Sequence, residues 1–138
     1  MSGDTGPGNT CPDELELLVF IMMGVMMAVD TAQIAGMLKP EEAQRRGVVA
    51  TGLHQSLHFR DVTVRYEDPH VLLIRNDGDL RGIVIDRPQE IVSAKIDDVR
   101  PMPSLLAAAG GSKSLWGAFL RGDECIMLID FYKLQEGP

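Results

Sequence analysis

Apolar residues gather in one long run near the start of the chain. Residues 17–29 read LLVFIMMGVMMAV, thirteen residues without a charge and with a single glycine. This is too short for a helix that spans a bilayer, which takes about 20 residues. A signal peptide needs a basic segment before its apolar run, but Asp13, Glu14 and Glu16 stand there instead. The run is therefore predicted to be buried in a folded core.

Gly24 lies in the middle of this run, with apolar residues on both sides. Two short strands joined by a tight turn fit that arrangement. The turn would contain Met22, Met23 and Val25, which are apolar where turn residues normally face water. If exposed, these side chains and Met26 would form a flexible apolar patch suited to a partner. The alternative is that another segment of the chain covers them.

A short helix is predicted directly after the hairpin. Asp30 is a candidate N-cap, and Ile34, Met37 and Leu38 share one face at helical spacing. Pro40 is expected to end this helix. The charged stretch 40–47 that follows predicts a further helical turn or two, in which Glu42 pairs with Arg46 and Gly47 closes the end.

The remainder of the chain alternates between strand and turn signals. Residues 62–66 alternate apolar and polar side chains, which is typical of a half-buried strand. Turn-forming residues separate the later apolar runs, most clearly in NDGD at 76–79 and RGDE at 121–124. Many short strands with minor helices, one of them expected after Ser104, indicate a mostly β barrel or sandwich.

Composition narrows the classes of partner. The chain has 138 residues, enough for one domain. Its formal net charge is −7, so nucleic acid and anionic membrane surfaces are not expected partners. The two cysteines, Cys11 and Cys125, are expected to be free thiols in a reducing cytoplasm, and a disulfide between them is the alternative.

Candidate chemistry is sparse. His54 and His58 are four residues apart, a metal-binding spacing on a helix, but on a strand they would lie about 13 Å apart. The GGSKS stretch at 110–114 lacks the spacing of a phosphate-binding loop. No reaction class gathers support, so no catalytic residue, cofactor or metal is predicted. A small-ligand or metal-binding barrel using His54, His58 and Asp61 is kept as an alternative.

The order of motifs resembles the CheW-like domain, the adaptor fold of bacterial chemotaxis. The first half begins with the family's apolar hairpin and short helix, here LVF at 18–20 and AV at 28–29. The second half carries, in family order, VLLI at 71–74, GIVID at 82–86, IV at 91–92, IDDVRPMP at 96–103, WGAF at 116–119 and IMLID at 126–130. Two features depart from the family pattern: the apolar hairpin turn, and residues 47–66 in place of an N-L-R-G-like motif.

The resemblance implies a fold of two packed, five-stranded, SH3-like barrels with short helices. It covers about residues 14–134 as two intertwined β-barrel subdomains, with a flexible tail at 1–13 and a short tail at 135–138. The implied function is that of a non-enzymatic adaptor that couples methyl-accepting chemoreceptors to a CheA-like histidine kinase. The candidate partner-binding residues are Met22, Met23, Val25, Met26, Met37 and Leu38.

The departures in the hairpin turn and in residues 47–66 leave a second possibility for the same fold. The domain could serve another receptor–kinase pathway, or it could assemble with itself as a homo-oligomer.

Overall fold

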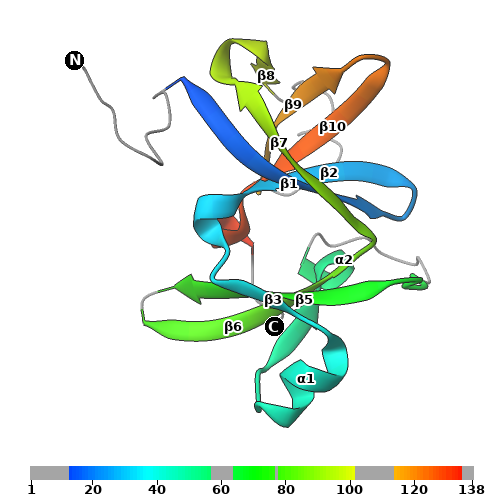
Figure 1. The fold of residues 1–138 in the computed structure, drawn as a ribbon, viewed down its shortest axis with the longest axis vertical. Coiled ribbons are helices and arrows are strands. Elements are labelled where there is room, and N and C mark those ends of the chain that lie inside the picture. Colours follow the sequence, from blue (N-terminus) through cyan, green and yellow to red (C-terminus); the bar gives the residue numbers. More distant parts are fainter. Residues whose placement is uncertain (1–12, 57–63, 77, 102–113, 135–138) are drawn as a thin grey trace.

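Two antiparallel-rich sheets make up the molecule and lie one above the other (Figure 1). The computed structural model describes residues 13–56, 64–76, 78–101 and 114–134. The larger sheet contains six strands, in the order β7 (Pro88–Lys95), β1 (Glu14–Met22), β2 (Val25–Asp30), β10 (Glu124–Ile129), β9 (Leu115–Arg121) and β8 (Val99–Pro101). The smaller contains four, in the order β3 (Gly36–Leu38), β5 (Pro69–Asn76), β6 (Asp79–Asp86) and β4 (Ala50–Gly52).

The predicted mostly β fold is confirmed, but the described strands divide six and four, not five and five. The physical reason is the path of the chain after β6. Arg87 adopts a left-handed conformation with φ of 45°, and the chain turns there out of the smaller sheet. β7 then pairs along the length of β1, from Glu14 opposite Lys95 to Phe20 opposite Pro88.

The predicted opening hairpin is present. β1 and β2 pair antiparallel from Leu17 opposite Asp30 to Met22 opposite Val25, so only Met23 and Gly24 form the turn. Both turn residues have positive φ, 54° and 78°. This mirror-image turn matches the right-handed twist of paired strands.

The two hairpins predicted from NDGD and RGDE are also confirmed. β5 and β6 close with Asn76 opposite Asp79, and β9 and β10 close with Arg121 opposite Glu124. Gly78 has a φ of 85°, so the glycine occupies a left-handed turn position that other residues rarely adopt.

The helix predicted for residues 30–38 is wrong beyond its first turn. Asp30 does cap a 3₁₀ turn, η1 (Thr31–Gln33), and its carboxylate accepts from the Ala32 amide at 2.9 Å. The chain then extends into β3, because Met37 and its neighbours pair with β5. Long-range pairing with an apolar strand outweighs a helical spacing of only three residues. Pro40 begins the next helix and does not end one.

That next helix, α1 (Pro40–Arg45), agrees with the sequence pattern. Arg46 donates to the Glu42 carboxylate at 2.9 Å, as the spacing predicts. Gly47 has a φ of 71° and follows the helix end. β4 and the short α2 (Leu53–Ser56) come next.

The strand predicted for residues 62–66 is not formed by the described part, residues 64–66, and residues 62 and 63 lie outside it. Directly after this segment, a side chain and not a strand backbone accepts the amide protons, since the buried Asp86 carboxylate accepts from Glu67 and Asp68. The Glu67 and Asp68 amide nitrogens lie 3.0 and 2.7 Å from Asp86 Oδ1. Several further predictions also lie outside the described residues. They are residues 1–12 of the tail predicted at 1–13, the helix expected after Ser104, the GGSKS stretch up to residue 113 and the C-terminal tail.

A shared core joins the two sheets. It buries Phe20 and Met27 of the larger sheet together with Leu72 and Ile83 of the smaller one. The 3₁₀ turn η3 (Phe131–Lys133) adds Phe131, and Asp130 caps it through the Tyr132 amide. A second cluster fills the concave side of the larger sheet, and a small third one lies under α1.

Candidate functional site

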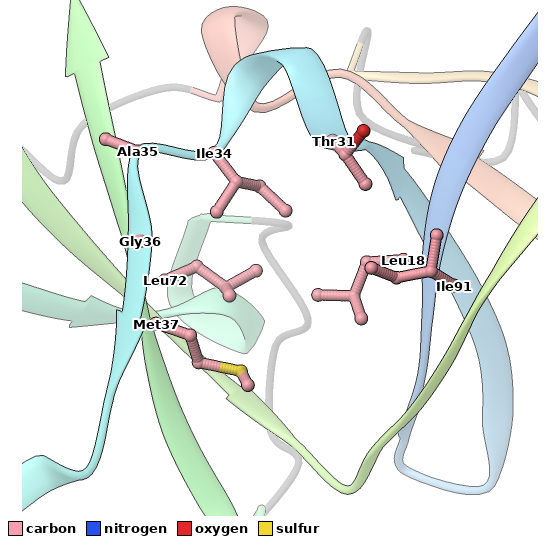
Figure 2. A pocket seen from close by; sticks show the side chains of 8 residues that line it. All are labelled: Leu18, Thr31, Ile34, Ala35, Gly36, Met37, Leu72 and Ile91. Carbon is pink, nitrogen blue, oxygen red and sulfur yellow. The ribbon is translucent and has the colours of Figure 1, made fainter. Parts of the chain in front are cut away.

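An apolar groove of about 250 Å³ opens between the two sheets (Figure 2). Its lining comes from both sheets and from the segment that connects them. The lining residues are Leu18, Thr31, Ile34, Ala35, Gly36, Met37, Leu72 and Ile91.

One wall belongs to the larger sheet. Leu18 on β1 stands opposite Ile91 on β7, so the two side chains emerge on the same face. Leu18 is buried at the base, whereas Ile91 is 59% exposed. This wall therefore offers a buried leucine below and an accessible isoleucine at the rim.

The facing wall repeats this arrangement from the smaller sheet. Met37 on β3 stands opposite Leu72 on β5. Leu72 is fully buried and Met37 is 46% exposed. Each wall thus pairs a buried leucine with an exposed large apolar residue, a lining suited to receiving apolar side chains from a partner.

Hydrogen bonds fix the segment that connects the two walls. The Thr31 hydroxyl donates to Glu16 Oε1 at 2.7 Å and ties η1 to β1. Gln33 donates to Asp130 Oδ1 and accepts from the Phe131 amide, both at 2.8 Å. These contacts hold the connecting segment against β1 and η3, so the groove is largely preformed.

The structure separates the six predicted partner-binding residues. Only Met37 lies in the groove. Met23 and Val25 are exposed at the tip of the opening hairpin. By strand geometry, this tip is about 13 Å along β1 from Leu18, so the hairpin tip and the groove are two distinct surfaces.

The expected apolar patch of Met22, Met23, Val25 and Met26 is wrong for two of its four residues, Met22 and Met26. Met22 is fully buried in the shared core, because it follows Leu18 and Phe20 at alternate positions along β1 and packs in the same cluster. Met26 packs against the concave cluster of the larger sheet. Leu38 packs against the cluster under α1, since it alternates with Met37 along β3.

The sequence did not predict that Leu18, Leu72 and Ile91 line a common groove. Each reads as an ordinary strand residue, and no local pattern distinguishes Ile91 from its neighbours. The groove exists only because two sheets from distant parts of the chain pack together.

The alternative metal-binding residues do not come together in the described part of the chain. His54 Nδ1 lies 2.8 Å from the Tyr66 hydroxyl, and their rings form an edge-on contact at 5.6 Å. His58 and Asp61 lie outside the described residues. In the ranges that the structure describes, no three His, Cys, Asp or Glu side chains lie close enough to hold a metal ion.

Tyr66 itself is a structural group. Burial raises the pKa of its phenol to about 12, and hydrogen bonds from the backbone at His54 and Leu53 oppose this rise. Cys125 is an exposed free thiol on β10. Among the described residues, no helix is both long and apolar enough to cross a membrane.

Comparisons with known proteins test the resemblance to the CheW-like family. No family model matches the chain. It is 28% identical over 90 residues to the chemotaxis protein CheW of Klebsiella aerogenes, which covers 64% of this chain and 54% of that protein. The chain thus spans about half the length of this relative.

A solved structure resembles nearly the whole chain. The scaffolding protein TtCheW from Thermoanaerobacter tengcongensis superposes with a TM-score of 0.68 at 15% identity, over 90% of this chain and 95% of that one. The chain therefore has a CheW-like fold, and part of it is similar in sequence to CheW.

Proposed function

We propose that this domain is a non-catalytic adaptor of the chemotaxis type, which couples a methyl-accepting receptor to a CheA-like histidine kinase in the cytoplasm. The observation that carries the proposal is the preformed apolar groove between the two sheets of a CheW-like fold. The sequence similarity to CheW supports the same reading.

The groove is assigned to the receptor. A helical partner segment can place apolar side chains between Met37 and Ile91 and reach the buried leucines behind them. Burial of such side chains at the centre of an interface supplies most of its binding energy. The groove needs no nucleophile or metal for this role.

The hairpin tip is assigned to the kinase. Met23 and Val25 are exposed apolar residues at the end of a long hairpin, about 13 Å along β1 from the groove. Two separate surfaces are what an adaptor requires if it is to hold two proteins at once. The assignment limits the partner-binding role to Met23, Val25 and Met37, and it leaves out Met22, Met26 and Leu38, which pack in or against core clusters.

The test is calorimetry with the purified chain, a cytoplasmic receptor fragment and the regulatory domain of a CheA-like kinase from the same organism. Saturable binding to each partner is the expected result. Ile91→Asp should lower receptor affinity at least about tenfold, because a charge would replace an apolar side chain at the groove.

A matched control is available on β9. Leu120 is 62% exposed, close to the value for Ile91, and lies outside the groove. Leu120→Asp should therefore leave receptor affinity unchanged. Equal effects of the two substitutions would reject the groove as the receptor site. Failure of both partners to bind the unmodified chain would move the function to another receptor–kinase pathway or to self-assembly.

A further inference from the structure

Met37 is the methionine that lines the groove. Figure 2 shows its side chain extending from β3 into the space between the two walls. At 46% exposure its thioether is accessible to small molecules in solution. A thioether in such a place is open to oxidation, which turns a flexible apolar side chain into a polar one.

The other described methionines differ in access. Met22 and Met27 are buried in the shared core. Met26 and Met127 are partly buried against core clusters. Met23 is 37% exposed but lies at the hairpin tip, away from the groove. If the rate of oxidation depends on exposure, Met37 is therefore the methionine whose oxidation changes the groove.

We propose that Met37 is a site of oxidative modification, and that hydrogen peroxide weakens partner docking in the groove by converting this residue to methionine sulfoxide. The effect on docking rests on the proposed function of the groove. The modification itself rests only on the position of the thioether.

The reaction balances with peroxide as the oxidant. A lone pair of the Met37 sulfur attacks one peroxide oxygen, and the oxygen–oxygen bond breaks. The second oxygen leaves as hydroxide and takes up the proton that the sulfur-bound oxygen releases, which gives the sulfoxide and water. Sulfur loses two electrons, and the peroxide gains them.

The sulfoxide oxygen would find no good partner in a closed groove. Leu18, Leu72 and Ile91 around it carry no side-chain donor, and the Thr31 hydroxyl already donates to Glu16. A partner that covers the groove would bury this oxygen without a hydrogen bond, which is unfavourable. Docking should weaken about tenfold.

The experiment uses the full chain with both cysteines replaced by serine, because thiols also react with peroxide. After timed treatment, peptide mass mapping measures oxidation at each methionine. Met37 and Met23 should oxidise well before Met22 and Met27. Slow oxidation of Met37, at the pace of the buried residues, would overturn the proposal.

Two readouts then follow the groove. Fluorescence of the apolar dye anilinonaphthalene sulfonate reports on the groove without any partner, and calorimetry measures affinity for the receptor fragment. Both should fall after peroxide treatment of the parent and of Met23→Leu. Both should persist in Met37→Leu, which keeps an apolar side chain that peroxide does not modify.

The proposal is rejected if peroxide still lowers dye fluorescence and receptor affinity in Met37→Leu. It is also rejected if peroxide no longer lowers them in Met23→Leu. Either result would place the peroxide-sensitive residue outside the groove. If the receptor fragment fails to bind even the untreated chain, the receptor assignment falls. The dye signal then decides alone whether oxidation of Met37 alters the groove.

Discussion

Met23 adopts a backbone conformation that methionine rarely adopts. It adopts a left-handed conformation with a φ of 54°, in a two-residue turn where asparagine is favoured. Such a conformation costs roughly 1–2 kcal/mol for most side chains. Strain of this kind collects at functional positions, which fits the assignment of the hairpin tip as a contact surface.

Met23→Asn should therefore stabilise the fold by about 1 kcal/mol, because asparagine tolerates the left-handed region. Urea denaturation measures the change. Val25→Asn is the matched control, since Val25 pairs in an extended strand and gains nothing from the exchange. A stabilised Met23→Asn variant that also binds the kinase domain less well would show that the strain is kept for contact. Unchanged stability would contradict the argument from backbone strain.

Tyr66 gives the fold a dependence on alkaline pH. Burial raises the pKa of its phenol from the ordinary 10.0 to about 12. The unfolded chain therefore loses this proton first as the pH rises. The contribution to stability is complete below about pH 10 and is lost as the pH passes through about 12.

Stability should accordingly fall between these two pH values more steeply in the parent chain than in Tyr66→Phe, which has no phenol to ionise. Urea titrations at several alkaline pH values test this. In a Tyr132→Phe background, phenolate absorbance reports on Tyr66 alone. Parallel pH profiles for the parent and Tyr66→Phe would contradict the prediction.

Gly82 sets how closely elements of the smaller sheet approach one another. A Cβ atom there would lie 2.6 Å from Val71 Cγ1 and 3.2 Å from both Ala50 Cβ and Val48 Cγ1. β6 pairs with β5 on one side and with β4 on the other at this residue. The glycine thus permits β4, an edge strand that begins a poorly patterned part of the sequence, to join the sheet.

Gly82→Ala should destabilise the fold by about 1–3 kcal/mol, because the neighbouring side chains and strands must move apart. Gly36→Ala is the control. A Cβ at Gly36 would lie 3.5 Å from Leu73, an ordinary contact, so its effect should stay within about 0.5 kcal/mol. Thermal or urea unfolding compares the two. If both substitutions lower the free energy of unfolding by similar amounts, the close contacts predicted at Gly82 do not destabilise the fold, and the prediction is wrong.

At the scale of elements, the sequence predicted what local chemistry determines. The three hairpins followed from their turn residues and flanking apolar runs, and Asp30 was identified as a cap. Residues 34–38 were misassigned as helix because their spacing fits a helix, while pairing with β5 decides their conformation. Residues 64–66 alternate like a strand, but the following amides bind the Asp86 carboxylate.

At the scale of the whole molecule, the resemblance predicted the fold, and the residues alone did not predict the groove. Met37 was singled out for its apolar character, but its partners across the groove were not. Leu18 and Ile91 meet because the chain leaves the smaller sheet after β6, and β7 then pairs with β1. The pairing of β7 with β1 depends on how the two sheets pack, and no local pattern in the sequence predicts it.

The shared core also determines how the molecule unfolds. Phe20 of the larger sheet is fully buried, and its ring centroid lies 6.5 Å from that of Phe131. The same cluster contains Leu72 and Ile83 of the smaller sheet. Because neither sheet can expose this cluster alone without losing apolar contacts of both, we expect the two sheets to unfold as one cooperative unit.

Phe20→Ala should lower the free energy of unfolding by about 3–5 kcal/mol, the usual result of removing a buried aromatic side chain. Urea unfolding followed by Trp116 fluorescence reports on β9 of the larger sheet, and hydrogen exchange of β5 and β6 amides reports on the smaller one. In Phe20→Ala, the urea midpoint and the exchange protection should fall together. In Leu120→Ala, a substitution at an exposed position, neither should change. Loss of protection in only one sheet would mean that the two sheets are separate folding units. The groove between them could then open and close without unfolding either sheet, and partner binding would no longer rest on a preformed site.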